Sequence, residues 1–290
     1  MSESHPYLVG LLGAGIQTSL TPPLHMAEAR QHGLTYIYRV IDTGQDHLDR
    51  DGLQRVLEAV RLLGFDGLNV TFPYKQRIIS VLDSLGPTAE RLGAVNTVLV
   101  SGDRLEGHNT DVTGFAAAVG NHLPDASLRS VVQLGAGGAG SAVADALMGL
   151  GATELHLVER DVERAETLAA SLKTRYADRT VTAVPASAAA DVLRHATGVV
   201  NCTPTGMAHH PGMPLEPGVL RPDMWVADIV YRPLETELMR AAVERGCRVL
   251  HGGFMAVYQA AQTFELITGR TPDPERMLAH LERLTATVPR

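Results

Sequence analysis

The fold is decided by the segment VVQLGAGGAG, residues 131–140. Its first four residues are typical of a strand, and apolar residues at helical spacing follow over residues 141–150. Between strand and helix, the first glycine allows a tight turn, Gly137 lets the backbone approach a pyrophosphate, and Gly140 lets the helix pack closely on the strand. The helix N-terminus would supply N–H groups and partial positive charge to the phosphates. The segment therefore predicts a dinucleotide-binding turn that comprises Gly135, Gly137, Gly138 and Ala139.

An acidic residue follows at the end of the next predicted strand, residues 154–158. A carboxylate at this position, Glu159, can accept hydrogen bonds from the adenosine ribose and would repel a 2′-phosphate, which favours NAD over NADP. The adjacent Arg160 favours the opposite, because a guanidinium can hold a 2′-phosphate or stack on adenine. The strand, the turn, the helix and the acidic residue all fit a cofactor site, so we prefer this interpretation to a glycine-rich turn without a ligand. Because of Glu159, we also prefer NAD to NADP as the cofactor.

Strand-like and helix-like segments alternate along the whole chain in two series. The first series predicts a helix at 53–63, a hairpin turn at 101–103, and strands at 8–12, 35–41 and 67–71. The second predicts helices at 141–150 and 162–177, and strands at 131–134, 154–158, 180–184, 198–202, 225–230 and 248–250. Strands separated by helices of this length imply right-handed crossovers and mainly parallel sheets. We therefore expect an α/β protein of two domains.

The expected domain boundaries follow from the break between the two series. Residues 1–114 and 256–290 should form one α/β domain with a mainly parallel sheet, and residues 115–255 a Rossmann domain. The segment from Met255 onward has a helical pattern. We expect this C-terminal helix to return to the first domain.

The composition of the 290-residue chain excludes several classes of function. Its net charge is −7, and no basic patch suggests nucleic acid as a partner. No apolar run reaches the roughly 18 residues of a membrane span, and the start, Met1 to Pro6, does not resemble a signal peptide. The two cysteines and twelve histidines show no zinc spacing, so we expect no metal. We expect a cytoplasmic protein, and the sequence leaves monomer and homodimer open.

Four polar clusters lie in the first series, at residues 19–25, 69–75, 93–97 and 107–111. Each member also has a structural interpretation: Ser19 or Thr21 as a helix N-cap, Asn96 and Asn109 as turn formers, Asp111 as a helix cap and Lys75 as a surface charge. Taken together they offer hydroxyls, amides, one ammonium and one carboxylate. That set suits the binding of a polyhydroxylated acid and the transfer of a proton.

These clusters resemble the shikimate/quinate dehydrogenase family, and the resemblance covers essentially the whole chain. The matching motifs are Asn-Val-Thr-x-Pro-x-Lys at 69–75, Gly-Ala-Val-Asn-Thr at 93–97, Gly-x-Asn-Thr-Asp at 107–111, Asn-x-Thr-Pro-x-Gly-Met at 201–207, Asp-x-x-Tyr-x-Pro-x-x-Thr-x-Leu at 228–238 and Gly-x-Met-x-Val-x-Gln at 253–259. The chain departs from the pattern of the biosynthetic shikimate enzymes at three places. Thr21 stands where those enzymes usually have a second serine, and Val112 stands where glycine is commoner. Glu159-Arg160-Asp161 stands where the NADP-using members usually have Asn-Arg-Thr. These departures resemble the NAD-dependent branch that accepts quinate.

The resemblance implies reversible oxidation of quinate or shikimate to the 3-dehydro acid, with NAD as the hydride acceptor. It implies that Lys75 and Asp111 handle the hydroxyl proton, that Ser19 and Thr21 bind the substrate carboxylate, and that Thr71, Asn96, Asp111 and Gln259 bind the substrate hydroxyls. The methyl group of Thr21 should shift the preference between the flat shikimate ring and the chair of quinate.

The cofactor is expected along the glycine turn, with Glu159, Arg160 and Arg164 at the adenosine end. Candidates for the nicotinamide side are Thr203, Met207, Tyr231, Gly252 and Met255. The two methionines fit a hydrophobic core equally well. Three other interpretations stay open: an NADP-dependent biosynthetic shikimate dehydrogenase, a related dehydrogenase acting on a folate, and a non-catalytic NAD-binding paralogue.

Overall fold

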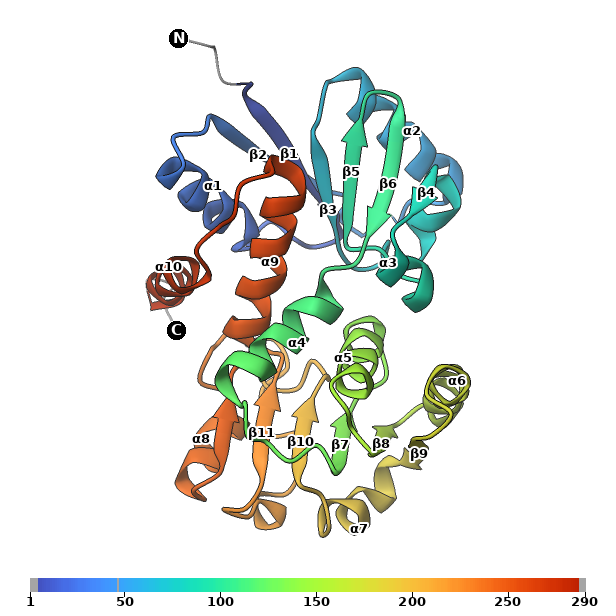
Figure 1. The fold of residues 1–290 in the computed structure, drawn as a ribbon, viewed down its shortest axis with the longest axis vertical. Coiled ribbons are helices and arrows are strands. Elements are labelled where there is room, and N and C mark those ends of the chain that lie inside the picture. Colours follow the sequence, from blue (N-terminus) through green and yellow to red (C-terminus); the bar gives the residue numbers. More distant parts are fainter. Residues whose placement is uncertain (1–4, 46, 287–290) are drawn as a thin grey trace. The chain divides into compact units, whose positions relative to one another are not determined.

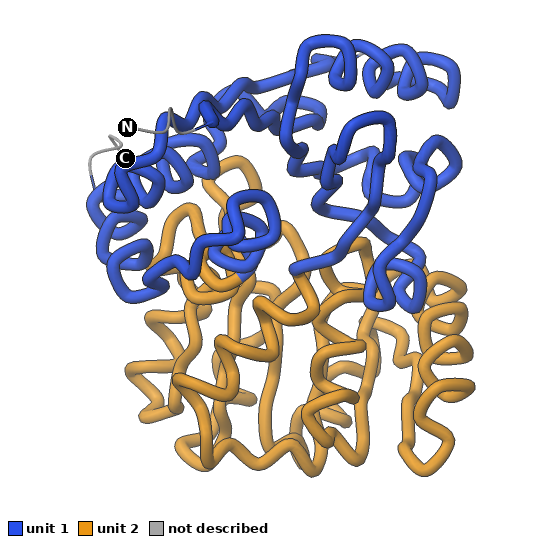
Figure 2. The backbone as a smooth tube through the Cα atoms, turned by 45° about the horizontal axis from the view of Figure 1, so that its top comes forward, with its two compact units in different colours: residues 1–110, 259–290 blue, residues 111–258 orange. Residues whose placement is uncertain are grey.

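The computed structural model describes residues 5–45 and 47–286 (Figure 1). The expectation about a signal peptide concerns residues 1–6, of which 1–4 lie outside the described residues. The chain forms two compact units, residues 1–110 with 259–290 and residues 111–258 (Figure 2). Both units are built from strands and helices in alternation, and the predicted two-domain α/β fold is confirmed. No helix among the described residues is long and apolar enough to span a membrane.

Unit 1 contains a six-stranded sheet in the order β2-β1-β3-β5-β6-β4. The strands are β1 (Tyr7–Gly13), β2 (Tyr36–Asp42), β3 (Gly67–Val70), β4 (Ser84–Leu85), β5 (Thr97–Ser101) and β6 (Arg104–His108). The pairings of β1 with β2 and β3, and of β4 with β6, are parallel. The β3–β5 and β5–β6 pairings are antiparallel, the latter through the predicted hairpin. The sheet is therefore mainly parallel, with an antiparallel portion that contains the hairpin.

The helices of unit 1 bury the apolar faces of this sheet. They are α1 (Thr21–Gln31), α2 (Arg50–Leu62), α3 (Pro87–Leu92), the last turns of α9 (Gly252–Thr268) and α10 (Pro274–Ala286). Asp49 caps α2 by accepting a hydrogen bond from the N–H of Gly52 at 2.8 Å, and the helix buries Leu53, Leu57 and Val60. On the other side of the sheet, Phe264 of α9 packs with Val9 and Tyr36.

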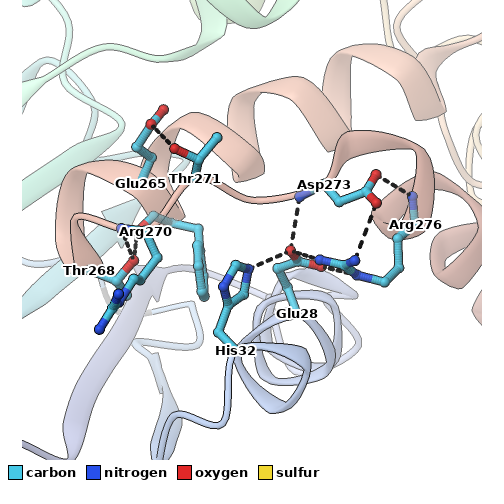
Figure 3. Close-up of polar contacts among 9 residues, drawn as sticks. Glu28, His32, Glu265, Thr268, Arg270, Thr271, Asp273 and Arg276 are labelled. Atoms are coloured by element: carbon cyan, nitrogen blue, oxygen red, sulfur yellow. Dashed lines mark hydrogen bonds and ion pairs between the residues drawn. The ribbon is translucent and has the colours of Figure 1, made fainter. Parts of the chain in front are cut away.

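The C-terminal helix is held to α1 by a buried carboxylate (Figure 3). Glu28 is only 2% exposed, and it accepts hydrogen bonds from the guanidinium of Arg276 at 2.5 and 3.0 Å. It also accepts the N–H of Asp273 at 2.9 Å and pairs with the ring of His32 at 3.0 Å. The predicted return of the C-terminal segment to the first domain is confirmed.

Unit 2 contains a six-stranded, fully parallel sheet in the order β12-β11-β10-β7-β8-β9. Its strands are β7 (Ser130–Leu134), β8 (Glu154–Glu159), β9 (Thr180–Pro185), β10 (Gly198–Asn201), β11 (Trp225–Asp228) and β12 (Arg248–Leu250). Its helices include α4 (Asp111–His122), α5 (Gly138–Gly149), α6 (Val162–Arg175), α7 (Ala189–Leu193) and α8 (Glu237–Glu244). Every residue of β7, β10 and β11 is buried, as expected for central parallel strands with helices on both faces.

Candidate active site

Backbone hydrogen bonds bring three of the polar clusters of unit 1 together. The carbonyl of Lys75 accepts the N–H of Val95 at 2.7 Å, and the carbonyl of Asn96 accepts the N–H of Val70 at 2.7 Å. The N–H of Asn96 donates to the carbonyl of His108 at 3.0 Å. Residues 69–75, 93–97 and 107–110 are therefore neighbours at one end of the sheet.

The first cluster, residues 19–25, follows the strand beside them. At the end of β1, the N–H of Ala14 donates to the carbonyl of Phe72 at 3.0 Å. Ser19 and Thr21 are half-buried. Helix α1 begins at Thr21 with Leu20 as its N-cap and no side-chain cap, while the Ser19 hydroxyl accepts the N–H of Thr21 at 3.3 Å. The interpretation of either residue as the helix N-cap is wrong, because the helix begins at Thr21 itself, one position too early for Thr21 to be the cap and one position too late for Ser19.

Lys75 lies on a short turn that a buried tyrosine anchors. Tyr74 is fully buried, and its hydroxyl bonds the hydroxyl of Thr43 at 2.7 Å and the N–H of Leu48 at 3.0 Å. The N–H of Tyr74 donates to the carbonyl of Thr71 at 2.9 Å. Thr71 and Lys75 are half-buried, so the turn presents a hydroxyl and an amino group from a fixed backbone.

Asn96 is 3% exposed, and its side-chain amide holds neighbouring residues in place. Its Oδ1 accepts the N–H of Thr110 at 2.9 Å and the hydroxyl of Thr97 at 3.1 Å, and its Nδ2 donates to the Thr110 hydroxyl at 2.9 Å. Asp111, which follows Thr110, is 7% exposed and is the first residue of α4. Gln259 is half-buried on α9.

The glycine turn of unit 2 has the geometry that the sequence predicts. Gly135 has a φ of +96°, and a Cβ at Gly140 would lie 2.4 Å from the carbonyl oxygen of Gly135. A Cβ at Gly137 or Gly138 would meet no protein atom within 4 Å. Gly135 and Gly140 are therefore required by the turn and its packing, whereas the space beside Gly137 and Gly138 is open to a ligand. Ala139, which follows them, is half-buried.

Glu159, at the end of β8, lies beside this turn. Its Oε2 accepts the N–H of Ala136 at 2.9 Å, and its Oε1 accepts the N–H of Arg160 at 2.8 Å. Partial burial acts to raise the pKa of Glu159, but the backbone N–H groups and the positive charge of Arg164 outweigh it and hold the pKa below its ordinary value. The carboxylate is therefore ionised at neutral pH. Arg160 and Arg164 are exposed, and Arg164 lies 3.9 Å from the carboxylate of Asp161, the N-cap of α6.

A buried network holds the loops that carry the nicotinamide-side candidates. Asn201 Oδ1 accepts the N–H and the hydroxyl of Thr203 at 3.0 and 2.7 Å, and its Nδ2 donates to Asp228 at 2.9 Å. Asp228 also accepts the N–H of Val230 at 3.0 Å and the hydroxyl of Thr236 at 2.7 Å. The motifs at 201–207 and 228–238 contain both residues, but the sequence did not reveal that they hold the two loops together.

The other nicotinamide-side candidates differ in exposure. Tyr231 is half-buried in the loop after β11, and a Cβ at Gly252 would lie 2.5 Å from the carbonyl oxygens of that loop. Met207 is 40% exposed in the loop after β10. Met255 is 9% exposed, so its environment matches the core interpretation more closely. No group of three or more His, Cys, Asp or Glu residues within the described part of the chain could hold a metal ion.

Comparisons with known proteins match segments in both units of the chain. The profile of the shikimate dehydrogenase substrate binding domain matches residues 11–98, and that of shikimate/quinate 5-dehydrogenase matches residues 118–205. The chain is 53% identical over 281 residues to the shikimate dehydrogenase (NADP(+)) of Streptomyces avermitilis, covering 97% of both chains. It is 45% identical to the quinate/shikimate dehydrogenase (NAD(+)) of Corynebacterium efficiens, covering 94% of this chain and 96% of that one.

A solved structure whose sequence identity to this chain is close to that of the Corynebacterium efficiens enzyme shares the fold. Quinate dehydrogenase from Corynebacterium glutamicum in complex with NAD superimposes with a TM-score of 0.90 at 43% identity, covering 96% of this chain and 99% of that one. Matches of this length and identity, together with the profile in each unit, show that the chain belongs to the shikimate/quinate dehydrogenase family of oxidoreductases.

Proposed function

We propose that the protein catalyses the reversible NAD-dependent oxidation of quinate and shikimate to their 3-dehydro acids. The gathering of Ser19, Thr21, Thr71, Lys75 and Asn96 from three sequence clusters at one end of the unit 1 sheet carries the proposal for the substrate. A site that bonds hydroxyls rejects analogues without them, because its buried polar groups are then left unpaired. The set of groups suits a small polyhydroxylated acid.

The preference for NAD rests on the surroundings of the glycine turn. The ionised carboxylate of Glu159 lies against the turn through Ala136, and Asp161 adds a second carboxylate two residues later. A 2′-phosphate would face both negative charges, whereas Glu159 Oε2 accepts the N–H of Ala136 and has a further lone pair for a ribose hydroxyl. Relatives of both kinds occur, since the Streptomyces avermitilis enzyme carries NADP(+) in its name and the Corynebacterium enzymes NAD(+).

The chemical role of the chain is to bind the carbon ring of the substrate and to accept one proton from it. NAD, which the glycine turn would hold, would supply the acceptor for the hydride that leaves the carbinol carbon. The hydroxyl proton passes to the neutral amine of Lys75, which becomes an ammonium, and the carbon–oxygen bond becomes a carbonyl. Asp111 would bond the same hydroxyl and orient Lys75. Ser19 and Thr21 bind the carboxylate, and Thr71, Asn96 and Gln259 bind the remaining hydroxyls.

The hydrogen bonds of the Asn96 amide support a donor role toward the substrate. Both lone pairs of its Oδ1 are already used, by the Thr110 N–H and the Thr97 hydroxyl. Because Nδ2 can only donate, any substrate atom that it contacts must be an acceptor. Asn96 therefore binds a substrate hydroxyl through that hydroxyl's oxygen lone pair.

An absorbance assay for NADH and NADPH tests the proposal. The purified protein is mixed with quinate, with shikimate or with neither, and each mixture receives NAD or NADP. We expect reduction of NAD with both acids and little reduction of NADP. Reduction of NADP with shikimate alone would identify a biosynthetic shikimate dehydrogenase. No reduction by a protein that still binds NAD would identify a non-catalytic paralogue.

A further inference from the structure

One side chain of α9 meets two of the polar segments of unit 1. Thr263 has no solvent exposure, and its hydroxyl lies 2.9 Å from the hydroxyl of Thr97 and 3.2 Å from that of Thr110. Asn69 Nδ2 lies at 3.5 Å, the limit for a hydrogen bond. Thr97 and Thr110 both bond the side chain of Asn96. Four side chains therefore form a closed ring in the order Asn96, Thr110, Thr263, Thr97.

The direction of every bond in this ring follows from the chemistry of Asn96. Its amide oxygen can only accept, so the single hydroxyl hydrogen of Thr97 points to Asn96. Thr263 must then donate to Thr97, and its own hydrogen is used. Thr110 must in turn donate to Thr263, while it accepts from Asn96 Nδ2. The bonds run one way around the ring, an arrangement in which neighbouring hydrogen bonds strengthen one another.

The ring connects groups that the proposed function uses. Asn96 is a proposed ligand of the substrate hydroxyls, and Thr110 directly precedes Asp111. Gln259 lies four residues before Thr263 on α9, which places both on the same face of that helix. Because the hydroxyl of Thr263 is bound on both sides, the rotation and register of α9 are fixed relative to Asn96.

We propose that Thr263 is a positioning residue for substrate recognition, and that it closes the ring that orients the Asn96 amide and Gln259. This inference rests on the proposed function. Thr263 does not touch the substrate. It acts by keeping the Nδ2 hydrogens of Asn96 aimed in one direction and by holding α9 at one register.

Three variants test the proposal in the full-length protein. Thr263→Val keeps the shape of the side chain but removes the hydroxyl, and Thr263→Ser keeps the hydroxyl. Thr268→Val is the matched control, because Thr268 is also buried on α9, but its hydroxyl donates to the carbonyl of Phe264 within the same helix at 2.7 Å. Each variant is measured for kcat and KM with quinate and shikimate, for the Kd of NAD, and for hydrogen exchange of the Thr110 amide, which donates to Asn96.

We expect Thr263→Val to lower kcat/KM for both acids by about tenfold or more, mainly through KM, and to leave the Kd of NAD unchanged. The Thr110 amide should exchange faster in this variant. Thr263→Ser should restore both properties, and Thr268→Val should match the wild type in both. An unchanged kcat/KM for Thr263→Val, or a loss that serine does not restore, would overturn the proposal.

The exchange measurement separates this inference from the proposed function. If the wild-type protein oxidises neither acid, the proposed function fails, and the role of Thr263 in substrate recognition fails with it. Faster exchange of the Thr110 amide in Thr263→Val would then show that the ring exists without that role. If the wild type is active and Thr263→Val changes neither exchange nor kcat/KM, only the inference about Thr263 fails.

Discussion

The two units build their candidate ligand sites by different physical means. In unit 1 the candidate groups are side chains, and other buried side chains hold them in place, as Thr97 and Thr110 hold Asn96. In unit 2 the glycine turn presents backbone, and absent side chains create the space beside Gly137 and Gly138. The first kind of site should therefore be sensitive to the loss of a single polar atom. The second should be sensitive to the addition of a single carbon.

The largest effect is expected from removing the one lysine of the substrate side. Lys75→Ala deletes the proposed acceptor of the hydroxyl proton, so kcat should fall by about a thousandfold, within the range for a general base. The Kd of NAD should stay near the wild-type value. Steady-state kinetics with quinate and titration with NAD measure the two quantities.

A matched control is available because the chain has two lysines. Lys173 is exposed on α6, and Lys173→Ala should keep the wild-type kcat. If Lys75→Ala turned over at a rate close to that of the wild type, the role of Lys75 in proton transfer would be excluded. The candidate site of unit 1 would then have no identified proton acceptor to set against the backbone turn of unit 2.

A methyl group added to the glycine turn should affect stability at one position and NAD affinity at another. Gly140→Ala places a Cβ 2.4 Å from the carbonyl oxygen of Gly135, so the turn must distort, and we expect a loss of about 3 kcal/mol in the free energy of unfolding. Gly137→Ala meets no protein atom within 4 Å, so folding should be retained while the Kd of NAD rises by about tenfold. Thermal unfolding and NAD titration separate the two cases. Equal NAD affinity in Gly137→Ala and the wild type would contradict the placement of the phosphates.

The buried carboxylate of unit 1 offers a test by pH. Burial acts to raise the pKa of Glu28, but hydrogen bonds from Arg276, Asp273 and His32 outweigh it, and the pKa lies below its ordinary value of 4.5. The stabilisation is therefore present above about pH 4.5 and is lost as the pH falls through the lowered pKa. Glu28→Gln should lose roughly 2 kcal/mol at pH 7, less than for a fully buried pair because Arg276 is partly exposed.

Denaturant unfolding between pH 3 and pH 7 (approximately the range of carboxyl titration) checks this expectation. The difference in the free energy of unfolding between the wild type and Glu28→Gln should become smaller toward pH 3. Glu265→Gln is the control, because Glu265 is exposed on α9 and contacts only the Thr271 hydroxyl in Figure 3. A gap that does not change with pH would mean that the ionised form of Glu28 does not stabilise the fold.

Local patterns predicted most of the fold because strands, helices and the glycine turn depend on neighbouring residues. The two-residue strand β4 was missed, since it is too short to show a pattern and forms by the pairing of Ser84 and Leu85 with β6. The N-cap interpretation of Ser19 and Thr21 was wrong because the prolines after them start the helix at Thr21. Thr263 was missed because an apolar helix pattern does not show which buried hydroxyl meets partners more than 150 residues away. A threonine among the buried residues of an otherwise apolar helix face was the available signal.

The smallest expected effect concerns the carboxylate that connects the glycine turn to β8. Glu159→Ala removes the acceptor for the N–H of Ala136 and the negative charge that a 2′-phosphate would face. NAD should bind more weakly, and the ratio of kcat/KM for NADP to that for NAD should rise by about tenfold, or about 1.4 kcal/mol. Glu166→Gln, which removes a charge from an exposed position on α6, should leave the ratio unchanged. An unchanged ratio in Glu159→Ala would refute the assignment of cofactor preference to this residue. Backbone alone would then recognise the cofactor in unit 2, and the contrast with the side-chain site of unit 1 would be sharper.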